Sequence, residues 1–183
     1  MQEVSVQDNF LDIEYFNNLK GQVLHKSFPW TVSTVENEHS LGINDYQLCH
    51  GVCNTIDGNH IIVSTFYEEL TPLFKLLDVL CCLRIKINLL KREEKLFEHP
   101  LHVDWGNAPD NLFTSILYFN TNNGYTRFED GTKIQSVENR LVTFPNHYKH
   151  SGTVNSCTEP HLSLIHISEP TRPRLISYAV FCL

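Results

Sequence analysis

The spacing of apolar and polar residues divides the chain into a helical first part and a strand-rich second part. Asp8 is a candidate N-cap for a first helix that ends at Gly21. Its apolar face consists of residues at helical spacing: Phe10, Leu11, Ile13, Phe16 and Leu19. A second amphipathic pattern runs from Thr65 to Leu77, and Pro72 interrupts it unless a helix begins there. A period near 3.6 residues behind a capping side chain predicts helices that pack on a core.

After about residue 80 the pattern changes to the two-residue period of strands. Leu83 to Leu89 alternates apolar with charged or polar residues and has one apolar face. Further strands are expected over Leu101–Trp105, Leu112–Phe119, Tyr125–Glu129, Lys133–Val137 and Leu141–Phe144. Short strands separated by turn residues are typical of an antiparallel sandwich or barrel. We expect one domain over residues 1–161, with a helical part at about 1–80 and a strand core at about 81–161.

Composition and charge exclude several classes of protein. The chain has 183 residues, of which 42% are hydrophobic and 11% aromatic, so it is long and apolar enough to bury a core. Lys and Arg number 14 against 21 for Asp and Glu, and no basic run is present, so nucleic acid is not favoured as a partner. Neither a signal peptide nor a bilayer-spanning apolar stretch is evident, which predicts a soluble cytoplasmic protein without a membrane partner.

Candidate metal ligands lie in the strand-rich part. In His102-Val103-Asp104, at the end of an expected strand, residues two apart point to the same side, so an imidazole and a carboxylate can reach one ion. His147 and His150 follow later, just after a strand that ends in Phe-Pro. Two imidazoles and one carboxylate can occupy one face of an octahedral iron and leave three positions open. Taken singly, His102 is better interpreted as a surface histidine and Asp104 as a turn residue.

In this context, residues 84–161 resemble the iron(II)- and 2-oxoglutarate-dependent oxygenases, particularly the prolyl-hydroxylase-like and phage-type branches. The resemblance rests on the segments RIKINL, EHPLHVDW, SILYFN, FEDG and NRLVTFPNHYKHSGT. It implies a double-stranded β-helix, a cupin-like jelly roll, with the N-terminal helices packed outside and iron at the open mouth. The distal histidine of the family lies five residues after the Pro, which selects His150 over His147. The resemblance therefore implies His102, Asp104 and His150 as metal ligands and catalytic centre.

The resemblance also implies a reaction. Members of the family consume dioxygen and 2-oxoglutarate and hydroxylate a peptide side chain, a protein side chain or a small metabolite, with ascorbate as a candidate auxiliary reductant. Asn88 matches a position from which some relatives direct a polar group toward 2-oxoglutarate, and Tyr118 is expected to point toward it inside the barrel. A solvent-facing asparagine and a core tyrosine are the structural alternatives. Two alternatives to the oxygenase function remain: a non-catalytic cupin-like metal-binding module, and a structural protein whose histidines bind nothing.

The residues from 162 to 183 resemble a translated sequencing-library adapter. LSLIHISEPTR and ISYAVFCL match its two fixed segments, and three residues separate them. The alternative is a natural strand, because LSLIHIS alternates as a half-buried strand does. We therefore expect the last barrel strand of the family to be missing or replaced, which predicts an open barrel edge and low stability.

The same junction affects the expected co-substrate site. In the family, an Arg or Lys on the strand after the distal histidine binds the distal carboxylate of 2-oxoglutarate, because a cation matches a carboxylate. Counting about a dozen residues past His150 reaches Leu162. The anchor is therefore expected to be absent, and activity to be weak. Arg172 and Arg174 lie beyond the junction and are not assigned this role.

Overall fold

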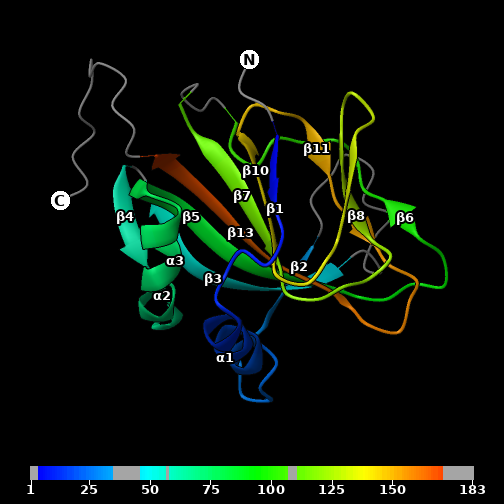
Figure 1. Ribbon diagram of the computed structural model, residues 1–183, viewed down its shortest axis with the longest axis horizontal. Coiled ribbons are helices and arrows are strands. Elements are labelled where there is room, and N and C mark those ends of the chain that lie inside the picture. The colour runs from blue at the N-terminus through cyan, green and yellow to red at the C-terminus, as the bar shows by residue number, and fades with distance from the viewer. Residues whose placement is uncertain (1–3, 35–45, 57, 107–110, 171–183) are drawn as a thin grey trace.

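The computed structural model describes residues 4–34, 46–56, 58–106 and 111–170, which form antiparallel sheets with helices on one side (Figure 1). The helices are α1 (Ile13–Val23), α2 (Phe66–Glu69) and α3 (Thr71–Leu76). The strands are β1 (Ser5–Gln7), β2 (Thr31–Thr34), β3 (Tyr46–Ile56), β4 (Asn59–Ile62), β5 (Val79–Leu90), β6 (Phe97–Glu98), β7 (Phe113–Tyr118), β8 (Tyr125–Phe128), β9 (Lys133–Gln135), β10 (Arg140–Pro145), β11 (His150–Ser151), β12 (Thr153–Val154) and β13 (His161–Pro170).

One large and two small sheets make up the β part. The large sheet has the order β1-β10-β7-β13-β5-β3-β2, with β4 paired to β3, and the small sheets are β11-β8-β9 and β12-β6. Every strand pair is antiparallel. In Figure 1 the helices lie below and to the left of the large sheet, and the small sheets lie on its other side. The mainly β class is as expected, whereas the detailed jelly-roll topology stays a prediction.

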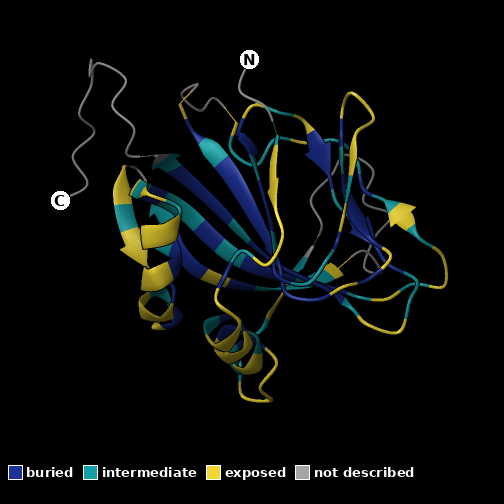
Figure 2. Cartoon of the chain, in the orientation of Figure 1, coloured by how far each residue is buried: buried dark blue, intermediate teal, exposed yellow. Residues whose placement is uncertain are grey.

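Two apolar clusters lie on opposite faces of the large sheet. The first joins the helices to the sheet, with Phe16 and Leu73 packed in one cluster with Ile87. The second contains Tyr118 together with Phe128 of β8. Side chains alternate along a strand, so β7, β10 and β13 each contribute to both clusters. Figure 2 shows these central strands as largely buried. We call the face of the second cluster, between the large sheet and β8, the interior face.

The first helix begins later than the sequence predicts. Asp12 is its N-cap, with its Oδ1 accepting hydrogen bonds from the backbone N–H groups of Glu14 (2.9 Å) and Tyr15 (3.2 Å). Asp8 does not cap it, because its carboxylate pairs with Arg140. The helix also continues through Gly21 to Val23. A glycine inside a helix costs about 1 kcal/mol, and burial of the apolar face offsets that cost.

The second helical pattern forms two short helices. Thr65 occupies the cap position of α2 but makes no side-chain capping bond; the hydroxyl of Ser64 accepts the N–H of Phe66 instead, at 3.1 Å. A new helix begins at Thr71 and places Pro72 in its first turn. Proline is tolerated there because its missing N–H would have no partner in the helix. The interruption of the helical pattern at Pro72 is therefore the start of a second helix, α3.

The expectation that residues 1–80 are helical is wrong in part. The strands β1 to β4 lie in this region and alternate with the helices. The longest, β3, has a register shift between Gly51 and Cys53 where it pairs with β5. A bulge of this kind breaks the two-residue period that identifies a strand in a sequence. The helices therefore do not precede all the strands.

Most strands expected after residue 80 are confirmed. The strands β5, β7, β8, β9 and β10 coincide with the predicted segments to within a few residues. The exception is Leu101–Trp105, which forms no strand and makes only a single bridge, between His102 and His150. Pro100 precedes this segment and has no N–H with which to extend a ladder.

A strand occupies the position expected to be missing or replaced. β13 pairs with β5 on one side and with β7 on the other, so the large sheet has no open edge here. Leu162 and Leu164 are buried in the cluster beneath the helices. Backbone pairing and apolar alternation are enough for such a strand, whatever its origin. Arg172 and Arg174 lie outside the described residues.

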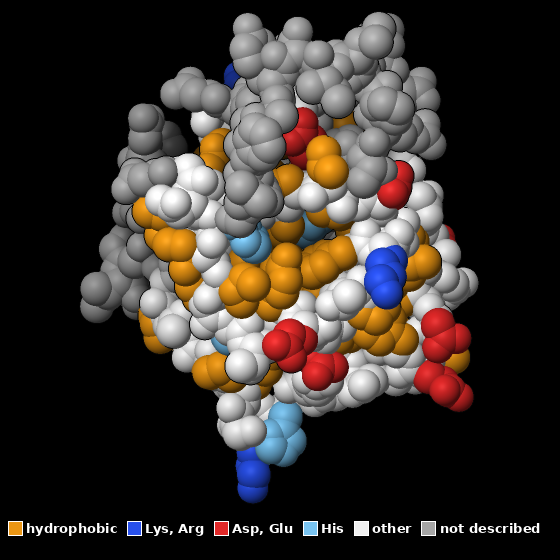
Figure 3. All heavy atoms as spheres, turned by 90° about the vertical axis from the view of Figure 1, so that its left-hand side faces the viewer, with side chains coloured by type: hydrophobic (Ala, Val, Ile, Leu, Met, Phe, Trp, Pro, Cys, Tyr) orange, Lys and Arg blue, Asp and Glu red, His pale blue; other side chains and the backbone are white. Residues whose placement is uncertain are grey.

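Exposed apolar side chains gather at the end of the molecule that carries β4, α2 and α3. They include Ile62 (54% exposed), Val63 (58%) and Leu80 (66%), and Figure 3 views this end. The small sheets lie at the opposite end in Figure 1, so this patch is not part of the site described below. Among the described residues, no helix combines the length and the apolar composition needed to cross a membrane.

Candidate metal centre

Two of the predicted ligands are held opposite each other by their own backbones. The N–H of His102 donates to the carbonyl of His150, and the N–H of His150 donates to the carbonyl of His102, each at 2.9 Å. The centroids of the two imidazole rings are 4.8 Å apart. His150 begins β11 and is buried, whereas His102 lies at the exposed rim. An ion between the rings is therefore accessible from the side of His102.

Backbone carbonyls fix the orientation of both imidazoles. Nδ1 of His102 lies 3.2 Å from the carbonyl oxygen of Pro100, and Nδ1 of His150 lies 3.1 Å from that of Tyr148. A carbonyl only accepts, so a neutral ring in this contact carries its proton on Nδ1. The lone pair is then on Nε2. Metal-binding histidines in proteins are oriented by the same kind of outer contact.

The third predicted ligand is a carboxylate that points between the two rings. The side chain of Asp104 is only 4% exposed, and its Oδ1 accepts a hydrogen bond from Nη2 of Arg84 at 2.9 Å. Its Oδ2 lies 3.3 Å from Nε2 of His150, but this contact lacks hydrogen-bond geometry. A buried carboxylate oxygen without a donor is costly. A cation beside Oδ2 would remove that cost.

The local charges favour the protonation states that bind metal. Burial raises the pKa of Asp104, but the close approach of His150 and the charge of Arg84 outweigh it and hold this pKa well below its usual range. Desolvation, followed by the charge of His150, lowers the pKa of His102 against the opposing effect of Asp104. At neutral pH the centre therefore offers an ionised carboxylate and a neutral imidazole from these two residues.

The three side chains fit a single metal ion. One ligand atom from each of His102, Asp104 and His150 lies within 4.8 Å of the others, and no other such group occurs in the described part of the chain. Two imidazoles and one carboxylate suit iron(II) and leave positions open on the metal. His147 is exposed and is not in this group. The structure thus brings together the residues that the resemblance selected.

Asn146 joins the segments that carry the ligands. Its Nδ2 donates to the carbonyl of Trp105 at 2.8 Å, and its Oδ1 accepts from the hydroxyl of Thr114 at 3.3 Å. The side chain is almost fully buried. It therefore connects the turn before His150 to the segment just after Asp104, and both to β7. Sequence reasoning missed Asn146, because these contacts join residues far apart in the chain.

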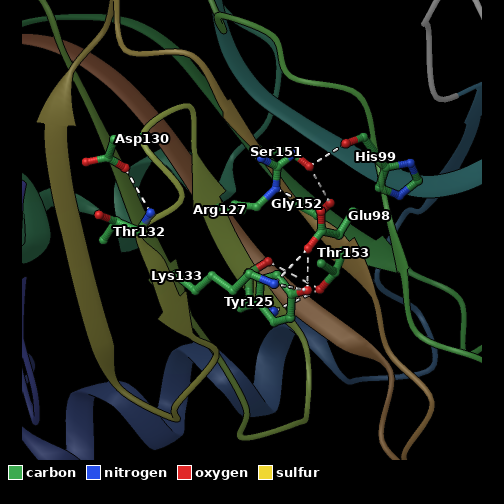
Figure 4. A network of polar contacts seen from close by, with 10 residues as sticks. All are labelled: Glu98, His99, Tyr125, Arg127, Asp130, Thr132, Lys133, Ser151, Gly152 and Thr153. Atoms are coloured by element: carbon green, nitrogen blue, oxygen red, sulfur yellow. Dashed lines mark hydrogen bonds and ion pairs between the residues drawn. The ribbon is translucent and has the colours of Figure 1, made fainter.

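A second polar network surrounds Glu98, in the segment that leads to His102 (Figure 4). Glu98 accepts hydrogen bonds from Tyr125 and from Lys133 (3.0 Å), and its Oε2 lies 2.8 Å from Nε of Arg127. The hydroxyl of Ser151, the residue after His150, donates to the carbonyl of His99. These contacts connect β8 and β9 with the segment that leads to His102. They limit how far the two histidines can separate.

The two residues expected near 2-oxoglutarate lie on the interior face. Asn88 is directly opposite Ser163 of β13, which in turn is opposite Tyr118 of β7. Asn88 is buried and its Oδ1 has no hydrogen-bond partner, so it is not the solvent-facing residue of the structural alternative. The hydroxyl of Tyr118 lies 2.6 Å from Oγ1 of Thr126. Burial raises the pKa of Tyr118 to about 12, so the phenol is neutral.

Arg84 contacts a candidate metal ligand, Asp104, and sequence reasoning missed it. It lies on the charged and polar face of the Leu83–Leu89 pattern, and the structure turns that face toward the interior rather than toward solvent.

We expect Arg84→Met to weaken metal binding by about 10- to 100-fold, because loss of an outer contact frees the ligand carboxylate. Titration calorimetry with manganese(II) measures this. Arg92→Met, at an exposed arginine just after the end of β5, should bind manganese(II) as the parent does. Equal weakening in both variants would contradict a positioning role.

Comparison with solved structures identifies proteins of the same fold. An oxidoreductase of the 2OG-Fe(II) oxygenase family from Burkholderia pseudomallei has a TM-score of 0.64 and 10% identity, covering 92% of this chain and 88% of that one. A Trichoplax adhaerens prolyl hydroxylase, in complex with a peptide fragment of the hypoxia inducible factor oxygen degradation domain, has a TM-score of 0.64 and 14% identity, covering 98% and 89%. The epimerase SnoN, in complex with Fe³⁺, α-ketoglutarate and nogalamycin RO, has a TM-score of 0.63 and 13% identity, covering 96% and 83%.

The TM-scores show that these proteins share the fold of this chain, although their sequences are only 10–14% identical to it. It is the fold of the oxygenases that residues 84–161 resemble, so the structural comparison and the motifs agree. No protein-family model matches the sequence, and sequence comparison with curated proteins finds no match.

Proposed function

We propose that the protein is an iron(II)- and 2-oxoglutarate-dependent dioxygenase that hydroxylates a peptide side chain, a protein side chain or a small metabolite. The observation that supports this most strongly is the arrangement of His102, Asp104 and His150, with both Nδ1 atoms against carbonyls and Asp104 Oδ2 without a donor. That arrangement suits one iron(II) ion. It occurs in a fold shared with an oxygenase and a prolyl hydroxylase.

The side chains of the centre have distinct roles in this proposal. His102 and His150 would hold the metal through Nε2, and Asp104 through Oδ2, while Arg84 keeps the carboxylate in place through Oδ1. Bound iron(II) with 2-oxoglutarate would supply the activation of dioxygen that hydroxylation requires. The buried position of His150 keeps water from one side of the centre, and the exposed rim at His102 gives the substrate access.

Asn88 and Tyr118 are proposed to contact 2-oxoglutarate. Both lie on the interior face in one cross-strand row, and both are buried. The Oδ1 of Asn88 has no hydrogen-bond partner, and the neutral phenol of Tyr118 lies 2.6 Å from the hydroxyl of Thr126. Both are polar groups on the interior face that a bound oxo acid could pair with.

We also propose that residues 162–183 derive from a translated adapter that replaces the last strand of the family. Two separate matches, three residues apart, support this origin. The segment supplies the alternation that β13 needs, and β13 contains no Lys or Arg. An anchor of the kind found in the family is therefore not provided by β13.

Formation of succinate tests the proposed function. The protein, with iron(II) and 2-oxoglutarate in air, should release succinate above a protein-free control, and more of it when an acceptable substrate is present. Nuclear magnetic resonance of the reaction mixture measures succinate and, when a substrate is present, its hydroxylated product. Removal of iron by a chelator or exclusion of oxygen should stop the reaction. Metal binding without any succinate would favour the alternative, a non-catalytic metal-binding module.

A further inference from the structure

Two buried cysteines lie side by side on the helix side of the large sheet. Cys53 of β3 and Cys82 of β5 are 1% and 6% exposed, and their Sγ atoms are 3.5 Å apart. Both are free thiols, and both pack in the cluster beneath the helices. Sulfur atoms at this distance are already in contact, so a disulfide bond of about 2.05 Å needs a movement of only about 1.5 Å.

An irregularity in β5 brings the two thiols together. Cys53 is directly opposite Ile85, which is three residues from Cys82 along the chain. In a regular strand, residues three apart point to opposite faces. The register of β5 against β13 shifts at Leu83, and Ile85 and Cys82 both point into the cluster beneath the helices. A bulge re-aims a side chain in this way, and here it aims Cys82 at Cys53.

The surroundings activate one thiol more than the other. The hydrogen bond from Cys82 lowers the pKa of Cys53 to about 7, against the effect of burial, and the nearby imidazole of His60 acts in the same direction. The same contact and burial raise the pKa of Cys82. The thiolate, not the thiol, is the nucleophile. Cys53 is therefore the attacking sulfur and Cys82 the resolving one.

A small oxidant can reach this pair from the edge of the sheet. Cys53 is opposite Ile62 of β4, a four-residue strand that pairs only with β3 among the described strands. Most of β4 is exposed. Segments with few buried contacts open locally at a fraction of the free energy of global unfolding. An opening confined to β4 uncovers Cys53 and admits a molecule the size of hydrogen peroxide.

We propose that Cys53 and Cys82 are a redox-modification site that hydrogen peroxide converts to a reversible disulfide. The Cys53 thiolate attacks one oxygen of the peroxide, the O–O bond breaks, and the leaving hydroxide takes up the proton of the Cys53 thiol as water. Cys53 is then a sulfenic acid. The sulfur of Cys82 attacks Cys53 Sγ, the S–O bond breaks, and hydroxide leaves with the proton of Cys82 as a second water. Two thiols lose two electrons, and one peroxide is reduced to two waters.

Peptide mapping by mass spectrometry tests the proposal. The protein is treated with hydrogen peroxide, alkylated under denaturing conditions and digested, with a chelator present to remove trace iron. We expect a pair of peptides that joins residue 53 to residue 82 and is lighter by two hydrogen atoms than its separate parts. Fragment ions distinguish Cys82 from the neighbouring Cys81. Dithiothreitol should reverse the link.

The oxidised protein should also resist heat better than the reduced one. A bond between residues 29 positions apart restricts the unfolded chain. We therefore expect the melting temperature to rise by about 5–10 °C on oxidation and to return on reduction. Differential scanning calorimetry of the two forms measures this shift, and Cys53→Ala should show none.

Two further variants assign the roles of the thiols. Cys82→Ala should leave Cys53 as a sulfenic acid that dimedone labels, because the resolving thiol is missing. Cys49→Ala is the matched control on the same strand, since Sγ of Cys49 lies 3.5 Å from the hydroxyl of Thr31 rather than against a thiol. It should form the link as the parent does. An oxidised parent in which residues 53 and 82 remain open to alkylation, or are joined to other cysteines, would overturn the proposal.

Discussion

Replacing His102, Asp104 or His150 with alanine is expected to raise the dissociation constant for iron(II) or manganese(II) by at least about 100-fold. Each residue supplies one of three ligand atoms that lie within 4.8 Å of one another, and loss of even an outer contact typically costs 10- to 100-fold. The Asp104 variant also leaves the guanidinium of Arg84 without its partner. Anaerobic titration calorimetry measures the affinity, and succinate formation should disappear in all three variants.

His147→Ala is the control for this experiment. His147 is three residues from His150, is exposed, and lies outside the group of ligand atoms. Its replacement should leave the affinity for metal unchanged. If His147→Ala lost the metal and His150→Ala kept it, the assignment of the distal ligand would be wrong, together with the spacing argument that selected it.

Replacing His166 with leucine should stabilise the protein by about 1–3 kcal/mol at neutral pH, since that is the usual cost of burying polar groups without partners. His166 lies on β13 with no exposed surface, and neither ring nitrogen has a hydrogen-bond partner. Its ring stacks on Phe74 of α3, with centroids 5.8 Å apart. Leucine is similar in volume and keeps this apolar contact. Chemical denaturation measures the free energy of unfolding.

The stabilisation by His166→Leu should increase as the pH falls. Burial lowers the pKa of His166 to about 4 from an ordinary value of 6.5. Between these values the unfolded chain takes up a proton that the folded protein does not, so stability falls as the pH decreases from about 6.5 to 4. At pH 5 this adds about 2 kcal/mol to the difference between variant and parent. Burial lowers the pKa of His161 to about 4 in the same way, so the variant keeps part of the acid sensitivity.

A matched variant separates this effect from a general one. His147→Leu makes the same change at an exposed histidine, and the difference in unfolding free energy between it and the parent should not grow between pH 7 and pH 5. A His166→Leu protein less stable than the parent at pH 5 would show that the ring finds polar partners in solution.

The start of α1 shows how far local sequence signals extend. The pattern of apolar residues predicted Asp8 as the N-cap. The structure uses Asp12 because Asp8 pairs with Arg140, and because the side-chain amide of Asn139 binds the N–H and carbonyl of Leu11 at 3.0 and 2.8 Å. These partners are about 130 residues away along the chain. No local pattern contains them.

The strand β5 shows the same limit for the candidate site. Its alternation predicted a strand with one apolar face, which is confirmed. The alternation did not predict which part of the structure covers each face of the strand. The helices cover the apolar face, so Arg84 reaches Asp104 and Asn88 is buried on the interior face. A two-residue period identifies two faces and does not say what covers each.

The sequence by itself determined the mainly β class and the strands β5, β7, β8, β9 and β10, because a two-residue period is a local property of the chain. It also singled out His102, Asp104 and His150, through the resemblance of residues 84–161 to a family. The tertiary structure decided which aspartate caps α1, that position 163 rather than 162 faces the interior, and that a single bridge, not a strand, holds His102 opposite His150. These outcomes depend on contacts between distant segments, whose energies compete with local preference and override it.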